Sequence, residues 1–196
     1  MHHLKNYSLI FFTYIFLSFP FHSQKNNDLK DLKEAVQLLN KIRKNPSTYS
    51  SLVGINLKGI PSTKPLTWND TLAKVAAKKA KEMATKNYFN HVDKKGYGLN
   101  YYINKSGYSL PKEWLDKKSN NFFESICAGD KTPQDGIIAL LNDEGIKKHS
   151  RAGHRVHLLS ISEFYQSNVD IGIGWYSDPN SYYKTYMVVV ISRHQW

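Results

Sequence analysis

The sequence predicts an α/β protein: an α-β-α sandwich with a central, mainly antiparallel sheet covered by helices on both faces. Two observations favour this fold class. Helical spacing of apolar residues dominates the early and middle parts of the chain, and strand-like segments come late. The last of these segments, 186–191, is apolar on both faces, which is typical of a strand in the middle of a sheet covered on both sides.

The first 23 residues differ from the rest of the chain. Residues 9–21 are almost wholly apolar and aromatic and follow a polar start. This run is shorter than the ~20 residues that span a bilayer comfortably, so it predicts a secretory signal peptide, 1–23, cleaved after Ser23. A retained N-terminal anchor is the alternative. We expect residues 24–32 to be a polar run-in and 33–196 to form one domain, secreted to an extracellular or periplasmic location and without a transmembrane span once the signal is removed.

The first long helix is predicted from apolar residues at steps of three and four, between Leu29 and Ile42. Asn45-Pro46 ends it, because a residue before proline avoids the α region. After a loop, a second helix begins behind Asn69, a natural N-cap. Its buried stripe is formed by small and apolar residues: Leu72, Val75, Ala76, Ala80 and Met83.

Between the second helix and the last strands we expect three further elements. A short helix over 99–103 is closed by Gly107. Residues 122–127 form a strand. A third long helix begins at Thr132-Pro133, with threonine as cap and proline at the first helical position, and ends near 142–145.

The strand predicted over 169–175 carries Gly172 and Gly174 on one face. Glycine inside a strand marks a place where another element lies close to the backbone. This strand and the one over 186–191 complete the sheet. The chain contains no internal repeat and no sign of a second domain.

The stretch 150–159 has the densest set of chemistry-bearing side chains. From His154 onward its spacing is helical, so His157 follows one turn later and Leu159 can face the core. Gly153 lacks a Cβ, and we expect it to permit a close approach of the backbone. We expect His149 and His157 to be solvated or capping residues.

Two upstream segments could meet this stretch. One contains His91, in a loop after the second helix, and the other contains Glu124, in the predicted strand 122–127. If they converge with His154, two histidines face carboxylates in one cleft. We expect Arg155 to hold one of those carboxylates by charge-assisted hydrogen bonds, either Glu124 or Glu144.

The charge of the chain is +11, and lysines are spread along most of it. No stripe that pairs lysines with stacking aromatics is visible in the sequence, so we expect no nucleic-acid partner. Anionic cell-envelope polymers or lipids are the partners that this charge favours. Solvated helix faces are the simpler alternative. The sequence gives no indication of oligomeric state.

The one cysteine, Cys127, cannot form an internal disulfide. Because its neighbours are apolar, we expect it to be a small buried side chain. An exposed, reactive thiolate is the less favoured alternative.

Five short motifs follow one another along the chain: Leu66-x-Trp68-x-x-x-Leu72-Ala73, Asn90-His91, Glu124-x-Ile126, Gly153-His154-Arg155-x-x-Leu158-Leu159 and Ile171-Gly172-Ile173-Gly174. In this order they resemble the CAP superfamily, or SCP domain, in its bacterial exported form. The resemblance covers about residues 33–193. Relatives include cysteine-rich secretory proteins, insect venom antigens and plant pathogenesis-related proteins.

The resemblance implies an α-β-α sandwich with a cleft of two histidines and two acids. Matched by motif, the histidines are His91 and His154, and the first acid is Glu124. The second acid follows the third long helix, where Glu144 fits best and Asp143 is the alternative. Some members of the superfamily bind zinc through the histidines, and others bind sterols or fatty acids in separate cavities. No general enzymatic activity is settled for the superfamily.

The chain departs from the superfamily pattern near this cleft. Ser125 replaces the asparagine expected after the acid, and Phe123 replaces the glycine before it. His157 stands where bacterial members usually have asparagine. The disulfides of the eukaryotic members are absent.

Two neutral imidazoles, His91 and His154, can hold a divalent metal such as zinc and leave positions open. The leading hypothesis is an exported binding protein whose cleft takes a divalent metal and a small or polymeric ligand, with no enzymatic activity required. One alternative is a metal-assisted hydrolase of peptide or cell-envelope amide bonds, with the tetrad His91, Glu124, Glu144 and His154 as catalytic residues. Others are a lipid or sterol carrier and a structural role, in which the His–acid pairs only pin helices onto the sheet.

Overall fold

The computed structural model describes residues 24–193, so the predicted signal peptide 1–23 lies outside the described residues. Its sheet has four strands in the order β1-β3-β4-β2, with bounds β1 Thr67–Trp68, β2 Glu124–Ala128, β3 Asp170–Ser177 and β4 Thr185–Ser192. β4 is antiparallel to both β2 and β3, whereas the short β1 is parallel to β3. The mainly antiparallel sheet that the sequence predicts is therefore confirmed.

Helices of very different length surround the sheet. The longest are α1 and α3, and single-turn 3-10 helices (η) join several of the others. The α-helices are α1 Gln24–Lys44, α2 Ser50–Val53, α3 Asp70–Thr85, α4 Leu99–Lys105, α5 Pro133–Asn142, α6 Gly153–Leu158 and α7 Glu163–Gln166; the 3-10 helices are η1 Pro46–Tyr49, η2 Lys112–Trp114, η3 Asp143–Gly145 and η4 His149–Arg151.

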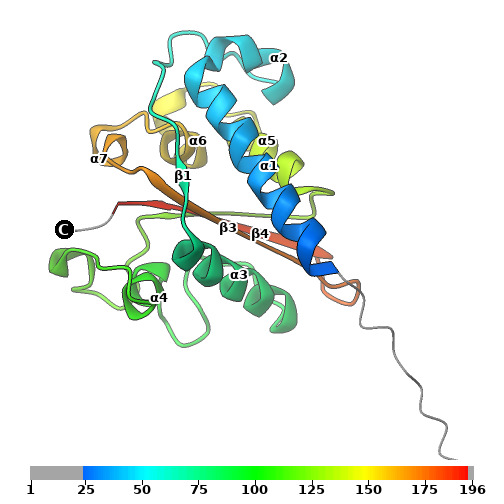
Figure 1. Cartoon of the computed structure of the whole chain (residues 1–196), viewed down its shortest axis with the longest axis vertical. Helices are drawn as coiled ribbons and strands as arrows, with labels where there is room; N and C mark the ends of the chain where they lie inside the picture. Colours follow the sequence, from blue (N-terminus) through cyan, green and yellow to red (C-terminus); the bar gives the residue numbers. More distant parts are fainter. Residues whose placement is uncertain (1–23, 194–196) are drawn as a thin grey trace, which may run out of the picture.

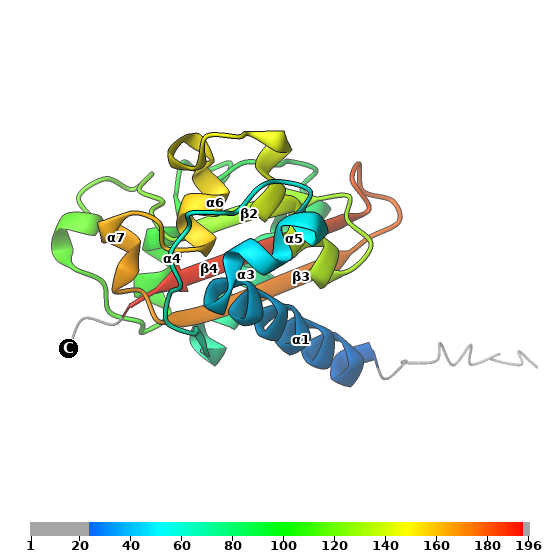
Figure 2. The same cartoon turned by 90° about the horizontal axis from the view of Figure 1, so that it is seen from above.

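The sheet separates two apolar cores, and alternate side chains of β4 enter each. Met187, Val189 and Ile191 pack with α1, α5 and α6, whereas Val188 and Val190 pack with α3 and α4. Figure 1 shows α1, α5 and α6 on one side of the sheet and α3 and α4 on the other, and Figure 2 shows β3 and β4 running side by side. The three-layer sandwich and the two-sided burial of the last strand are confirmed.

The predicted helix caps are present. Asn69 Oδ1 accepts hydrogen bonds from the backbone N–H groups of Thr71 and Leu72 at the start of α3. The hydroxyl oxygen of Thr132 accepts one from Asp135 N at the start of α5. These bonds satisfy N–H groups that have no partner within their own helix.

The two strand glycines allow α3 to lie directly on β3. A Cβ on Gly172 would lie 2.1 Å from the nitrogen of Ala73, and one on Gly174 would lie 2.2 Å from the carbonyl carbon of Ala76. Both neighbours are helix backbone, which cannot move aside. The predicted close approach at these two positions is confirmed.

The structure differs from the sequence prediction at α1 and β1, and the short helices α2 and α7 were not predicted either. α1 begins at Gln24, so the expected run-in 24–32 is helical. The parallel strand β1 was not predicted, because two residues are too few to show an alternating pattern. Within residues 24–193, no helix is both long and apolar enough to cross a membrane.

Candidate functional site

His91 and His154 line one cavity of about 530 Å³. His91 lies in the loop after α3 and His154 in the first turn of α6, and Glu124 and Ser125 of β2 contribute to the same wall. The fold therefore brings together the three segments singled out in the sequence. His91 and Glu124, for example, are 33 residues apart in the chain.

The first imidazole is paired with a buried carboxylate. His91 Nδ1 lies 2.8 Å from Glu124 Oε2, and the side chain of Glu124 is 0% exposed whereas that of His91 is 45% exposed. The same carboxylate oxygen accepts a hydrogen bond of 3.0 Å from Asn121 Nδ2. Glu124 is thus fixed in the wall, and the imidazole it holds reaches the solvent.

Lys79 holds the His91 loop from the side of α3. Its Nζ donates a hydrogen bond of 3.0 Å to the carbonyl oxygen of His91 and lies 5.1 Å from the centroid of the Tyr88 ring. Burial lowers the pKa of Lys79, and the nearby carboxylates of Glu124 and Asp93 raise it again. A buried ammonium from α3 therefore fixes the backbone of the loop on which the imidazole stands.

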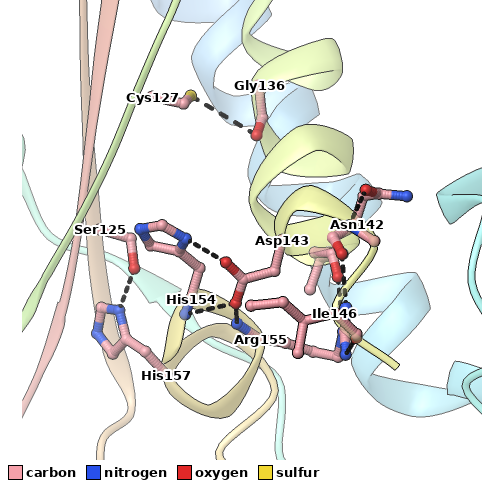
Figure 3. A network of polar contacts seen from close by, with 11 residues as sticks. Ser125, Cys127, Gly136, Asn142, Asp143, Ile146, His154, Arg155 and His157 are labelled. Atoms are coloured by element: carbon pink, nitrogen blue, oxygen red, sulfur yellow. Dashed lines mark hydrogen bonds and ion pairs between the residues drawn. The ribbon is translucent and has the colours of Figure 1, made fainter. Parts of the chain in front are cut away.

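The second imidazole is paired with Asp143. His154 Nδ1 lies 2.8 Å from Asp143 Oδ1, with side-chain exposures of 33% and 8% respectively. Asp143 Oδ2 also accepts a hydrogen bond of 3.0 Å from the backbone N–H of His154, at the start of α6. Figure 3 shows this carboxylate between the end of α5 and the start of α6, facing both groups.

The preference for Glu144 as the second acid was wrong, because Asp143 is the acid that pairs with His154. Glu144 is exposed and lines a different cavity, beside α2 and α5. Asp143 and Glu144 both have left-handed backbones, with φ of 52° and 55°, and this reversal turns Asp143 inward. Sequence spacing could not show it, since neither residue is a glycine, the usual sign of such a turn.

Arg155 does not bind a carboxylate through its guanidinium, contrary to expectation. The side chain is fully buried and donates to the carbonyl oxygens of Leu141 (2.6 Å), Asn142 (2.6 Å) and Ile146 (2.8 Å). The last carbonyls of a helix have no partner within it, so this guanidinium closes the end of α5 and supports the left-handed turn at Asp143 (Figure 3).

His157 is buried, so the expectation of a solvated or capping residue was wrong. Its Nδ1 lies 2.8 Å from the hydroxyl oxygen of Ser125, and its Nε2 lies 3.4 Å from the carbonyl oxygen of Ile191. Because a carbonyl only accepts, Nε2 carries the proton and the hydroxyl of Ser125 donates to Nδ1. Burial lowers the pKa of His157 to about 4, so the ring is neutral near pH 7.

The Ser125–His157 pair joins two residues at which the chain departs from the superfamily pattern. The residue that follows Glu124 and the residue one turn after His154 thus meet at the floor of the cavity. A carbonyl, rather than a carboxylate, lies at the far nitrogen of His157. The pair therefore lacks the acid that orients the base in a Ser-His-Asp triad.

Three smaller expectations can be compared with the structure. A Cβ on Gly153 would meet nothing within 4 Å, so the predicted close approach at this glycine was wrong. His149 is partly exposed and lies 3.2 Å from Arg155, outside the histidine cavity. Cys127 packs against the α1–α5 core, and burial raises the pKa of its thiol, as expected for an unreactive side chain.

The two carboxylates fix which nitrogen of each imidazole faces the cavity. A carboxylate accepts a hydrogen bond, so His91 and His154 each donate through Nδ1, and Nε2 is the ring nitrogen left for a ligand. Histidines that bind metals in proteins commonly have this arrangement, with the second ring nitrogen bonded to a carboxylate. In its neutral form, each ring can offer the Nε2 lone pair to a cation or accept a hydrogen bond there from a ligand.

The described residues offer a cation few ligands beyond the two imidazoles. Among residues 24–193, no three His, Cys, Asp or Glu side chains are grouped so as to hold a metal ion. Glu124 Oε1 is buried and receives no hydrogen bond from the part of the chain that the structure describes. The donor set is thus two imidazoles with one spare carboxylate oxygen behind them, which suits an open, weakly held ion.

A sequence model of the cysteine-rich secretory protein family matches residues 36–191. The chain belongs to this family, also called CAP. The match spans nearly all the described residues and includes every side chain of the cavity. No curated protein matches this CAP protein.

Solved structures show the same fold. The CAP chain is similar to an extracellular protein containing an SCP domain from Bacillus anthracis, with 20% identity and a TM-score of 0.51, over 85% of this chain and 41% of that one. It is also similar to an outer surface protein of Borrelia burgdorferi, with 17% identity and a TM-score of 0.54, over 85% and 94% of the two chains. This chain thus spans about two fifths of the length of the Bacillus protein.

Proposed function

We propose that this CAP protein is exported and that its histidine cavity binds a divalent cation, zinc in the first instance, together with a small or polymeric ligand. The observation that carries the proposal is the matched pairing of both imidazoles. His91 and His154 each present Nδ1 to a carboxylate at 2.8 Å and line the same cavity. A purely structural pair of histidines has no need to share one solvent-accessible cavity.

A divalent ion in this cavity would be bound through the two Nε2 atoms. Glu124 and Asp143 would act behind the imidazoles, holding the rings in place and raising the basicity of the free nitrogens. When bound, the ion supplies a Lewis acid that attracts oxygen atoms of a ligand. Asn121 lies in the same wall and offers a polar group to such a ligand.

The export part of the proposal is supported by the apolar segment 9–21 and by the sources of the two similar structures, an extracellular and an outer surface protein. Proteinase accessibility of the protein on intact cells of its source tests this part directly.

Thermal unfolding with and without zinc tests the cavity proposal. A ligand that binds only the folded state at 100 times its Kd stabilises that state by about 2.7 kcal/mol. We expect a rise in Tm for the wild type that is lost in His91→Ala and His154→Ala. His149→Ala is the matched control, because that imidazole lies outside the cavity, and it should keep the full rise.

An equal rise in all four proteins would show that zinc binds elsewhere and would refute the proposal. The hydrolase alternative is measured in the same proteins with a panel of peptide and peptidoglycan amides. Turnover that is present in the wild type and absent in both cavity variants would favour that alternative. Turnover unchanged in both variants would exclude this cavity as its site.

A further inference from the structure

The face formed by α3 and α4 carries a concentration of lysines that the sequence did not reveal. Two adjoining cavities of about 250 and 590 Å³ share four lining residues: Lys78, Glu82, Tyr102 and Lys105. We call the exposed lysines around them the lysine surface: Lys74, Lys78, Lys81, Lys86, Lys95 and Lys105. It belongs to the layer opposite α1 and shares no lining residue with the histidine cavity.

Both carboxylates that line the two cavities already have partners within the protein. Their carboxylates are Glu82 and Asp93. Glu82 forms an ion pair with Lys86. Asp93 is buried and accepts hydrogen bonds from the Tyr102 hydroxyl and from two backbone N–H groups. The lysines other than Lys86 therefore keep a positive charge that no carboxylate of the two cavities pairs with, and together they attract an anion that enters the cavities.

The lysines of α3 are spaced for a chain of charges. Lys74, Lys78 and Lys81 are four and three residues apart, so they lie on one face of the helix at intervals of about one turn, or ~5 Å. Lys105, in the last turn of α4, lies across the cavities from them. A third cavity shares Lys105 and continues the lysine surface to Lys117 and Lys118. The cations thus form a track rather than a single anion site.

Tyrosines adjoin the track, in contrast to the sequence-based expectation that no lysine stripe meets aromatics. Tyr97, Tyr101 and Tyr102 pack on one another, with ring centroids 4.3 to 6.2 Å apart. Each also has a lysine ammonium over its ring, at 5.4 to 5.7 Å from the centroid. These ring faces are therefore engaged within the protein.

We propose that the lysine surface binds a linear anionic polymer whose phosphate or carboxylate groups are spaced along a polyol or sugar backbone. Nucleic acid is disfavoured because single strands stack their bases on free aromatic faces, and the cations here are lysines rather than the arginines whose planar fork binds base edges. A bilayer is disfavoured because helices that bind membrane surfaces add large apolar side chains. None of the exposed large apolar side chains among the described residues lines either cavity.

Binding of the chain to immobilised polymers tests the proposal. The probes are poly(glycerol phosphate) and polygalacturonate, with neutral dextran, duplex DNA and anionic phospholipid vesicles for comparison. The variant is Lys78→Glu with Lys105→Glu. Its matched control is Lys33→Glu with Lys58→Glu, which makes the same change in net charge at exposed lysines outside the lysine surface.

We expect the wild type to bind both anionic polymers and not dextran, with an affinity that falls as salt is raised. The lysine-surface variant should lose at least tenfold in affinity, and the control less than twofold. Lys78→Gln with Lys105→Gln should give an intermediate loss. Equal losses in variant and control would reduce the effect to net charge and overturn the proposal. So would binding no stronger than to dextran, or tighter binding to DNA or vesicles than to both polymers.

Discussion

Replacing Asp143 by asparagine tests whether Asp143, rather than Glu144, is the acid that holds His154. Asp143 accepts from both His154 Nδ1 and His154 N, through different oxygens. Asparagine keeps a single accepting oxygen and turns an N–H₂ group toward the second donor. The exchange removes at least one hydrogen bond to a charged, nearly buried acceptor, which is worth about 1.5 to 3 kcal/mol.

We therefore expect Asp143→Asn to lower the free energy of unfolding by about 2 to 3 kcal/mol, measured by urea denaturation in the absence of metal. It should also weaken zinc binding by about 10- to 100-fold, the usual effect of losing the carboxylate behind a ligating imidazole, measured by calorimetric titration. Glu144→Gln is the matched control. This neighbour is exposed, so both quantities should be nearly unchanged, within about 0.5 kcal/mol. Similar effects in the two variants, or full zinc affinity in Asp143→Asn, would refute the role assigned to Asp143.

Two further predictions concern the floor of the cavity and the sheet. The pKa of His157 is lowered to about 4, so between pH 6.5 and 4 the unfolded chain binds a proton on this ring more tightly than the folded chain does. The free energy of unfolding should therefore fall by about 3 kcal/mol as the pH falls through this range. In His157→Asn this part of the pH dependence of urea unfolding should vanish, and an identical dependence in both proteins would contradict the prediction. Gly174→Ala should lower the free energy of unfolding by at least ~2 kcal/mol, because its Cβ would lie 2.2 Å from the backbone of α3. The control Gly153→Ala should lower it by less than ~0.5 kcal/mol, because a Cβ there meets nothing within 4 Å. Comparable losses in urea denaturation would show that α3 does not lie where the structure places it.

The fold was predictable where local chemistry and tertiary packing agree. Asn69 and Thr132 each marked a helix start by a cap that the structure contains. Gly172 and Gly174 marked the face of β3 on which α3 lies. In each case the signal is carried by one or two neighbouring residues, so it can be read without knowing what the rest of the chain does.

The site was predictable in part. His91, Glu124 and His154 stood out by their motifs, and the structure places them on one cavity. The choice of Glu144 failed because a left-handed turn at two non-glycine residues, supported by the buried Arg155, is set by tertiary contacts. The burial of His157 was missed for a related reason: its partner, Ser125, lies on a strand 32 residues earlier.

The lysine surface was missed because lysines at 74–105 are not a contiguous run. Their helical spacing on α3 was visible, and it was interpreted as an ordinary solvated face. Only the packing of α4 against α3 adds Lys105 and the tyrosines to that face. Charge patterning along a sequence therefore underestimates a surface that two helices share.

The most direct test of the account is the protonation of the two cavity imidazoles, observed by long-range ¹H–¹⁵N correlation NMR at pH 7 before and after zinc is added. The account predicts that His91 and His154 both carry the proton on Nδ1, and that zinc shifts the Nε2 resonance of both rings together. A ring that carries its proton on Nε2 and none on Nδ1 in the metal-free protein, or zinc-induced shifts confined to one of the two rings, would contradict it.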